Sequence, residues 1–342
     1  MIKKILIANR GEIAVRIVRA CAEMGIRSVA VYSDADRHAL HVKRADESYS
    51  LGQDPLAGYL NPQRLVSLAV ETGCDALHPG YGFLSENAHF SELCEQHGIK
   101  FIGPSAEVIR RMGDKTEARR SMIAAGVPCT PGTEGNLADL AEAIREAARI
   151  GYPVMLKATS GGGGRGIRRC NSQEELEQAY PRVISEATKA FGSAEVFLEK
   201  CIVNPKHIEA QILADSFGNT VHLFERDCSI QRRNQKLIEI APSPQLTPEQ
   251  RAYIGELSVR AAKAVGYENA GTVEFLLADD EVYFMEMNTR VQVEHTITEE
   301  ITGIDIVREQ IRIASGLPLS IKQEDIQYHG FALQFRINAE DP

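Results

Sequence analysis

The sequence predicts a fold of mixed class, α/β followed by α+β, and three observations lead to this prediction. Up to about residue 112, short apolar segments alternate with amphipathic segments of helical period, which is typical of βαβ units around a parallel sheet. Residues 157–170, KATSGGGGRGIRRC, place a run of glycines between cationic residues. From residue 204 onward the pattern changes to alternating strands and hairpins, which favours antiparallel pairing.

Composition limits the classes of function. The chain has 342 residues, of which 44% are hydrophobic and 25% charged, as expected for a soluble globular protein of two or more domains. Its net charge of −9 argues against non-specific binding of nucleic acid. No apolar run has the length of a membrane span. The seven cysteines are scattered without a C-x-x-C pair, so we expect reduced thiols and a cytoplasmic protein with no nucleic-acid or membrane partner.

The first part of the chain predicts a parallel sheet with helices around it. We expect strands at 2–8, 28–33, 74–78 and 100–102, and helices at 11–24, 61–72 and 86–97. In the first helix, Ile13, Ile17, Cys21 and Met24 form one apolar stripe. Ligands of parallel sheets bind at the carboxyl ends of the strands. Residues 9–11 (NRG) and the loop HPGYGFLSEN at 78–87 are placed there.

The glycine run is interpreted as the tip of a hairpin. A dinucleotide-binding loop would open into a helix, and a Walker A loop would continue as G-K-[ST], whereas here Gly166 is followed by Ile167. Strands at 153–158 and 166–169 instead flank the run, and glycine allows its backbone N–H groups to face an anion. Lys157 and Arg165 add positive charge. The stretch therefore predicts a mobile phosphate-binding flap, with a plain flexible linker as the alternative.

A second cluster, GTVEFLLADDEVYFMEMNTRVQVEH at 271–295, predicts a metal site on two neighbouring strands. Glu286 and Asn288 are two residues apart and share one strand face. An odd-numbered connection would put Glu274 opposite Glu286 on that face, and an even-numbered one would put it on the other face. Oxygen ligands of this kind suit Mg²⁺ bound together with nucleotide phosphates. The alternative, a solvated sheet face, explains Glu281 but not Glu286.

The residues around this cluster suggest acid–base chemistry. Arg290, Gln292 and Glu294 follow the second strand, and ERDCSIQRRNQK brings Lys236. A carboxylate beside a fixed cation can act as a base on a small acidic substrate that the cation holds. A solvated charged edge is the alternative for Arg232 or Arg233 taken singly, and explains Lys236 less well. A hinge is expected near residues 204–205.

Taken together, these features resemble the ATP-grasp superfamily and, within it, the biotin carboxylases. The resemblance covers the whole chain and rests on motifs that occur in order: IANRGEIAVRI, HPGYGFLSEN, MGDK, KATSGGGGRGIR, FLEK, ERDCSIQRRNQK, GTVEF, EMNTRVQVEH, ITGID and FRINAEDP. The strings QRRNQKLIEIAPSPQ and EHTITEEITGIDIV look most like the biotin carboxylase subunit of two-subunit bacterial pyruvate carboxylases. The corresponding subunits of acetyl-CoA carboxylases share nearly all of these motifs.

The resemblance implies an ATP-grasp fold with defined parts. Residues 1–113 would form an N-terminal Rossmann-like domain and 114–130 a helical linker. Residues 131–203 would form the mobile lid with the glycine flap, and 204–342 a mainly antiparallel C-terminal domain. The family's last domain extends further than residue 342, so that domain is expected to be incomplete and the strand at 330–339 to lack neighbours.

The resemblance also assigns roles to individual residues. Those expected to bind ATP are Lys115, Lys157, Gly161, Gly162, Gly163, Gly164, Gly166, Glu199, Lys200, Ile202, His207, Gln231 and Asn234. Those expected to bind the metal, Mg²⁺ or Mn²⁺, are Glu274, Glu286 and Asn288. Those expected to bind bicarbonate or biotin are Lys236, Arg290, Gln292, Val293, Tyr81, Gly82 and Arg336. Glu294 would be the catalytic base, with Arg290, Lys236 and Arg336 as the other catalytic residues.

The implied reaction is the carboxylation of carrier-bound biotin by bicarbonate with cleavage of Mg-ATP, through carboxyphosphate, in a ligase that forms a C–N bond. The chain has no A-M-K-M biotinylation motif, so the biotin carrier and the carboxyltransferase are expected on another chain, and the full-length protein as a homodimer. Asn234 and Ile167 depart from the His and Met common in the family. The acyl acceptor stays open between pyruvate and acetyl-CoA or another acyl-CoA. A biotin-independent ATP-grasp ligase of carbamoyl-phosphate type and a nucleotide-binding regulatory module are the rival functions.

Overall fold

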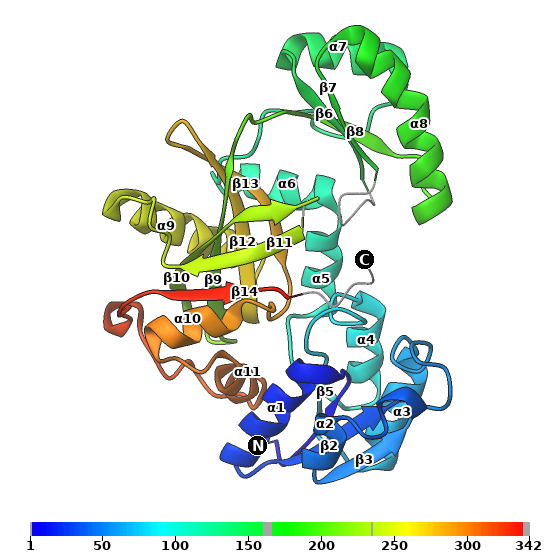
Figure 1. Cartoon of the computed structure of the whole chain (residues 1–342), viewed down its shortest axis with the longest axis vertical. Helices are drawn as coiled ribbons and strands as arrows, with labels where there is room; N and C mark the ends of the chain where they lie inside the picture. The colour runs from blue at the N-terminus through cyan, green and yellow to red at the C-terminus, as the bar shows by residue number, and fades with distance from the viewer. Residues whose placement is uncertain (1, 160–165, 234, 338–342) are drawn as a thin grey trace.

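The structure is a computed structural model that describes residues 2–159, 166–233 and 235–337. Within these ranges the strands form three sheets of five, six and three strands. Figure 1 shows the sheets one above another along the long axis, with the five-stranded sheet at one end, the three-stranded sheet at the other and the six-stranded sheet between them. The mixed α/β and α+β class predicted from the sequence is confirmed.

The five-stranded sheet is parallel, with the order β3-β2-β1-β4-β5. Its strands are β1 (Lys4–Ile7), β2 (Arg27–Tyr32), β3 (Glu47–Ser50), β4 (Ala76–His78) and β5 (Lys100–Phe101). Its helices are α1 (Gly11–Glu23), α2 (Leu40–Arg44), α3 (Pro62–Glu71), α4 (Ala88–Gln96) and α5 (Ala106–Gly113), with a 3₁₀ turn η1 at Asp34–Asp36. The predicted strands and helices are present, with ends shifted by up to two residues. Strand β3 was missed because its sequence, ESYS, is polar and mostly exposed.

Helix α1 attaches this sheet to the rest of the molecule. Its predicted stripe is confirmed, because Ile13, Ile17 and Cys21 are buried and Met24 packs against the same core. That core also includes residues of α11 (Ile306–Ala314) and of the six-stranded sheet. Apolar contacts are the main stabilising term of such an interface. The sheet is therefore held firmly against the elements that carry the site.

The three-stranded sheet, with the order β7-β6-β8, lies in the segment predicted to form the lid, and we keep that name for it. The segments from residue 115 to 200 are α6 (Lys115–Ala124), α7 (Leu140–Ile150), β6 (Val154–Ala158), β7 (Ile167–Cys170), α8 (Gln173–Phe191) and β8 (Val196–Lys200). Strands β6 and β7 pair antiparallel, and the Ala158 N–H donates to the Gly166 carbonyl over 2.8 Å, so the predicted hairpin is confirmed. The predicted tip, Gly161–Gly164 with Arg165, lies outside the described residues, as does Asn234.

The six-stranded sheet is antiparallel, with the order β13-β12-β9-β10-β11-β14. It contains β9 (Lys206–Ala214), β10 (Thr220–Arg232), β11 (Gln235–Ala241), β12 (Asn269–Ala278), β13 (Glu281–Asn288) and β14 (Ala332–Phe335). Its helices are α9 (Pro248–Ala264) and α10 (His295–Thr302), and the 3₁₀ turn η2 spans Gln323–Asp325. The strand expected at 330–339 without neighbours is shorter, and it pairs antiparallel with β11.

The limits assigned to the domains, 1–113, 114–130, 131–203 and 204–342, stay a prediction. Among the described residues, no helix combines the length and the apolar character that crossing a membrane requires.

Candidate active site

The two glutamates predicted as metal ligands, one on β12 and one on β13, face each other across the two strands. Glu274 lies opposite Glu286, and Thr272 lies opposite Asn288. The connection is a two-residue turn, because Ala278 pairs with Glu281. An even-numbered turn should put the two glutamates on opposite faces, but the register slips by one residue between Phe275 and Glu274. This β-bulge restores the shared face.

Glu274 is the most heavily bonded carboxylate of the site. Its Oε1 accepts hydrogen bonds from Lys236 Nζ at 2.9 Å, Asn288 Nδ2 at 2.7 Å and Gln292 Nε2 at 2.8 Å. Its Oε2 lies 2.5 Å from His207 Nε2. Burial raises the pKa of Glu274, but Lys236 and His207 outweigh it and lower the pKa. Glu274 is therefore anionic, as a metal ligand must be.

Glu286 has the opposite electrostatic environment. Its side chain is exposed, but the surrounding protein atoms reduce the hydration of its carboxylate, and this effect, followed by the charge of Glu274, raises its pKa. Two carboxylates that repel each other across a ladder are a good site for a divalent cation, since the cation favours the charged form of both. The Oδ1 of Asn288 accepts from Arg290 Nη2 at 3.0 Å, which brings a third oxygen to the same ladder. The residues present thus fit Mg²⁺.

Six side chains of alternating charge form a continuous series through the site, which we call the charge chain. In order they are Arg226, Glu209, Lys236, Glu294, Arg336 and Glu239. Lys236 Nζ lies 2.8 Å from Glu294 Oε1, and Arg336 Nη2 lies 2.9 Å from Glu294 Oε2. The predicted base is therefore held between two of the predicted catalytic cations. Burial lowers the pKa of Lys236, but Glu209, Glu274 and Glu294 together raise it well above the usual range.

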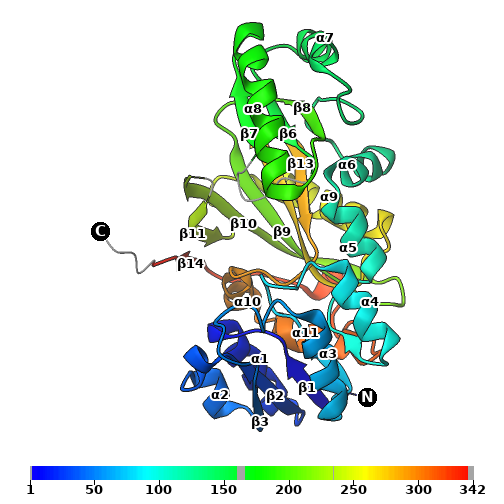
Figure 2. The ribbon, with the colours of Figure 1, turned by 90° about the vertical axis from the view of Figure 1, so that its right-hand side faces the viewer.

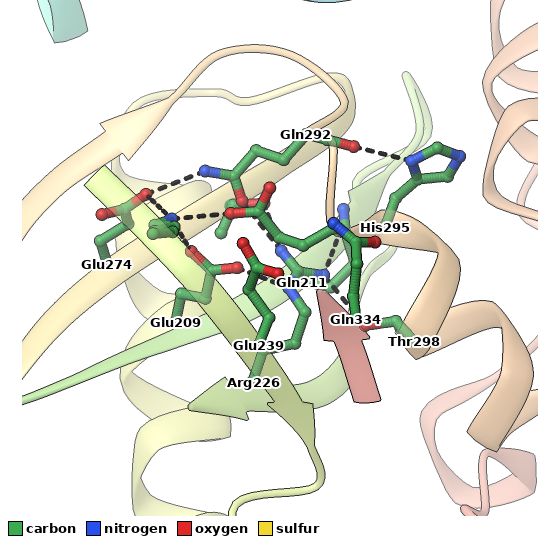
Figure 3. Close-up of polar contacts among 12 residues, drawn as sticks. Glu209, Gln211, Arg226, Glu239, Glu274, Gln292, His295, Thr298 and Gln334 are labelled. Atoms are coloured by element: carbon green, nitrogen blue, oxygen red, sulfur yellow. Dashed lines mark hydrogen bonds and ion pairs between the residues drawn. The ribbon is translucent and has the colours of Figure 1, made fainter. Parts of the chain in front are cut away.

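Arg226, at the buried end of the charge chain, was not predicted from the sequence. It is fully buried, and all five of its N–H donors have acceptors. The acceptors are Glu209 Oε1 at 2.5 Å, Gln211 Oε1 and Thr298 Oγ1 at 2.9 Å, Thr272 Oγ1 at 3.2 Å and Gln292 Oε1 at 2.9 Å. Figure 3 shows Arg226 among four of these partners, Glu209, Gln211, Gln292 and Thr298. Arg226 thereby orients Gln292, a predicted bicarbonate ligand, and its strand sequence carries no signal of that role.

The loop 78–87 reaches the site through one residue that sequence reasoning missed. Arg290 Nε donates to Glu86 Oε2 over 2.8 Å, and the Thr289 N–H lies 3.3 Å from Glu86 Oε1. Glu86 is the one acidic residue of HPGYGFLSEN, and this was the sequence feature that could have marked it as a partner for a cation of the site. The loop joins the parallel sheet to the catalytic segment that follows β13.

Asn9 supports this loop from the end of β1. Its Nδ2 donates to the carbonyls of Pro79 at 2.7 Å and Tyr81 at 2.8 Å. Gly80 has a φ of +62°, and a Cβ there would lie 2.9 Å from Asn9 Nδ2, so glycine is required by both backbone and space. Asn9 and the loop follow parallel strands β1 and β4, as predicted. Tyr81 and Gly82, the predicted biotin contacts, belong to this supported loop.

The predicted nucleotide residues gather between the lid and the six-stranded sheet. Lys157 of β6 pairs with Glu199 of β8, and Arg119 Nη1 lies 3.5 Å from the other oxygen of Glu199. Burial lowers the pKa of Lys115, and Lys157 adds to this, while Glu286 and Glu199 oppose it. These side chains therefore share one electrostatic environment, which spans the lid and strand β13, the strand of the predicted metal ligand Glu286.

The remaining nucleotide residues lie on both sides of the connection from β8 to β9. Lys200 Nζ donates to the carbonyls of Gly151 at 2.8 Å and Tyr152 at 2.9 Å, so its ammonium group is engaged within the lid. Ile202 is half-buried in the connection. His207 Nδ1 accepts from Gln231 Nε2 at 2.8 Å, so its Nε2–H donates to Glu274. Of these predicted ATP-binding residues, His207 thus contacts the predicted metal ligand Glu274, and Gln231 is linked to it through His207.

One cysteine, Cys228, borders the site, because its Sγ lies within 4.8 Å of carboxylate oxygens of Glu209 and Glu294. All seven cysteines are free, and Cys228 is buried on β10. Burial and then the charge of Glu209 raise the pKa of the Cys228 thiol well above its usual value. The thiol is therefore protonated and packed, as expected of a small core residue.

A parallel sheet, a hairpin lid and an antiparallel sheet with paired carboxylates beside lysines define an ATP-grasp enzyme. Two family models match the chain. "Biotin carboxylase, N-terminal domain" covers residues 1–109, and "Carbamoyl-phosphate synthase L chain, ATP binding domain" covers residues 114–322. The chain belongs to the biotin carboxylase family and is an ATP-dependent ligase.

Similar proteins cover the whole chain. The 2-oxoglutarate carboxylase small subunit of Hydrogenobacter thermophilus is 59% identical over 100% of this chain and 73% of its own length. Biotin carboxylase 1 of Bacillus subtilis is 56% identical over 100% and 77%. The crystal structure of the Hydrogenobacter biotin carboxylase domain dimer with MgADP, ADP and bicarbonate has a TM-score of 0.96, at 59% identity, over 100% of this chain and 76% of that one. A biotin carboxylase complex from Campylobacter jejuni has a TM-score of 0.97 at 50% identity, over 100% and 77%.

Proposed function

We propose that the chain carboxylates carrier-bound biotin with bicarbonate at the expense of Mg-ATP, and that the charge chain is the reacting centre. The observation that carries this proposal is the position of Glu294, whose two oxygens accept from Lys236 at 2.8 Å and from Arg336 at 2.9 Å. A base held between two cations is suited to a substrate that enters as an anion and must still lose a proton. The related structure with bound MgADP and bicarbonate supports the same substrates here.

The three ion pairs of Lys236 indicate how bicarbonate would bind. All three of its N–H donors are directed at the carboxylates of Glu209, Glu274 and Glu294. Bicarbonate would therefore take the place of one of them. We assign that place to Glu294, because its other cationic partner, Arg336, is 29% exposed, whereas Arg226, the other partner of Glu209, is fully buried. Glu294 then accepts the bicarbonate proton, while Lys236 and Arg290 hold the dianion, with Gln292 and the Val293 backbone beside them. The deprotonated oxygen attacks the γ-phosphorus of ATP, and ADP leaves.

The nucleotide is assigned to the space between the lid and the metal strands. Lys115 and Lys157 neutralise phosphate charge, and Glu199, Lys200, Ile202, His207 and Gln231 are the proposed base and ribose contacts. Gly161–Gly164, Gly166 and Asn234 are proposed to complete the site from the flap and from the turn between β10 and β11. Mg²⁺, when bound, neutralises charge on the transferring phosphoryl group. Glu274, Glu286 and Asn288 are the residues that would hold it.

Biotin is assigned to the outer end of the charge chain. The guanidinium of Arg336 lies beside Glu294, and the Arg336 side chain is 29% exposed. It would stabilise the anion formed when the ureido nitrogen of biotin loses its proton. Tyr81 and Gly82 are proposed to line the same pocket. The biotin carrier and the carboxyltransferase are proposed as components on other chains, and the complete protein as a dimer, as in the related domain dimer.

The acyl acceptor is proposed to be a 2-oxo acid, pyruvate or 2-oxoglutarate. Two structures at 59% identity come from carboxylases of these two acids. A carboxylase of acetyl-CoA or another acyl-CoA is the alternative. The acceptor would be identified by adding the carboxyltransferase component with each acid in turn and measuring which one gains a labelled carboxyl group from labelled bicarbonate.

The deciding experiment measures ADP release from Mg-ATP with bicarbonate present and free biotin added or omitted. Biotin-stimulated release is expected, and Glu294→Ala should keep Mg-ATP binding but lose turnover by about 100-fold or more. Glu281→Ala, which removes an exposed carboxylate from the same pair of strands, is the matched control. ATP cleavage that ignores biotin would instead support a biotin-independent ATP-grasp ligase of carbamoyl-phosphate type, and unchanged turnover in Glu294→Ala would refute the proposed base.

A further inference from the structure

The outer end of the charge chain holds a buried carboxylate that none of the assigned roles uses. Glu239 of β11 is fully buried, at 0% exposure. Its Oε1 accepts from Arg336 Nε over 2.6 Å, whereas its Oε2 has no hydrogen-bond partner among the described residues. A buried carboxylate with one unpaired oxygen destabilises a fold. Packing alone therefore does not account for a glutamate at this position.

A second buried glutamate of the same sheet shows what a purely structural pair looks like. Glu225 receives Arg251 Nε on both oxygens, at 2.9 and 3.1 Å, and also accepts the Ser243 N–H at 3.0 Å. Both of its oxygens are paired. Glu239, in contrast, has a single donor within the described part of the chain, and that donor is Arg336, the residue assigned to biotin.

The strand ladder explains how Glu239 reaches Arg336. Glu239 lies opposite Gln334, so Arg336, two residues further on and directly after the end of β14, is its diagonal neighbour. Diagonal neighbours are within reach of long side chains. Strand β14 lies at the outer edge of the sheet beside β11 (Figure 2), and Glu239 ties the arginine of this edge strand to the interior.

We propose that Glu239 is a positioning residue that keeps Arg336 in place when Glu294 turns from Arg336 to bicarbonate. This inference rests on the proposed function. Arg336 has two carboxylate partners in the structure, Glu239 through Nε and Glu294 through Nη2. When Glu294 acts as the base, Glu239 is the partner that remains. Without it, the guanidinium would lose its fixed direction toward biotin at the step that needs it.

The test compares Glu239→Gln, which keeps the side-chain shape but removes the charge, with the matched control Glu225→Gln. In Glu239→Gln, kcat/KM for biotin should fall about 10-fold or more, as for the loss of one charge-assisted hydrogen bond. The slower bicarbonate-dependent ATP cleavage without biotin should stay within about 2-fold, because Arg336 is assigned to the biotin step. Glu225→Gln should leave both rates unchanged once its fold is verified by circular dichroism. Equal losses with and without biotin, or no loss at all, would overturn the positioning role.

A second readout does not depend on activity. The Arg336 Nε–H should give a slowly exchanging signal in a ¹⁵N-edited spectrum, assigned by its loss in Arg336→Lys. The signal should broaden or exchange rapidly in Glu239→Gln and persist in Glu225→Gln. Glu239→Asp, which keeps the charge on a shorter side chain, should restore part of the protection and serves if the glutamine variant does not fold. A protected signal in all the glutamate variants would refute the inference, whereas absent biotin stimulation in the unaltered protein would refute only the proposed function.

Discussion

Arg290 Nε lies 2.8 Å from Glu86 Oε2, and this ion pair joins the segment that follows β13 to the loop that follows β4. Arg290 was predicted to hold bicarbonate, and the structure shows that the parallel-sheet part of the protein fixes its direction. Glu86 is also bonded by the backbone of Thr289. The pair therefore couples the position of a loop assigned to biotin with that of a residue assigned to bicarbonate.

The first prediction tests this coupling. Glu86→Gln removes the charge that orients Arg290, so KM for bicarbonate should rise about 10-fold, while KM for ATP changes little. Steady-state ADP release at varied bicarbonate measures the effect. Glu92→Gln, which removes an exposed carboxylate paired with Arg110 on the neighbouring helix, is the control. An equal rise in both KM values would show that Glu86 acts on the fold and not on the anion site.

Metal binding gives the second prediction. Glu286→Gln removes one of the two carboxylates that face each other across the bulged ladder, so the Mg²⁺ concentration for half-maximal ADP release should rise at least ~10-fold, since changes beyond the direct ligands already reach that size. Glu281→Gln, on the same strand but exposed beyond the site, should have no effect. Direct titration of Mn²⁺ by electron paramagnetic resonance checks the affinity without turnover. An unaltered Mn²⁺ affinity would remove Glu286 from the metal site.

Arg226 gives the third prediction, on stability. Arg226→Met leaves Glu209 buried with one cation fewer and removes the donor to Gln292, so the free energy of unfolding should fall by about 3–5 kcal/mol. Urea denaturation followed by circular dichroism measures the change. Arg19→Met, which removes an exposed i,i+4 pair with Glu23, should change it by less than ~1 kcal/mol. A similar small change in Arg226→Met would mean that the five hydrogen bonds contribute little net stability.

Buried histidine gives the fourth prediction, on pH. Loss of hydration lowers the pKa of His78 from 6.5 to about 3, and its Nδ1 accepts the Gly80 N–H at 3.0 Å, which requires the neutral ring. The unfolded chain binds the proton more readily, so this contribution to stability is present above pH 6.5 and is lost as pH falls toward about 3. His78→Asn, whose Oδ1 can accept the same N–H, should flatten the pH dependence of the free energy of unfolding in that window. His89→Asn, at an exposed position, should leave it unchanged; an identical profile in His78→Asn would contradict the assignment.

Local sequence was sufficient for most of the framework. The apolar stripe of α1 predicted a helix that is buried on that face, and the glycines between two short strands predicted the β6–β7 hairpin, because both signals depend on neighbours within one element. The family resemblance, carried by motifs spread over the whole chain, identified the ATP-grasp fold and the biotin carboxylase family. Strand β3, which has no apolar pattern, could not be recognised in this way.

The geometry of the site was decided by the tertiary structure. From the sequence, Glu274 was expected to face Glu286 only if the turn had an odd number of residues. The turn has two residues. The bulge reverses the outcome, because side chains alternate with a period of two and a slip of one residue exchanges the faces. The burial of Arg226 and the pairing of Glu239 with Arg336 join residues far apart in the chain. Such contacts follow from how strands are ordered in the sheet, which no local pattern encodes. The sequence alone thus determined the elements and the family, and the packing of the sheets decided which charges meet.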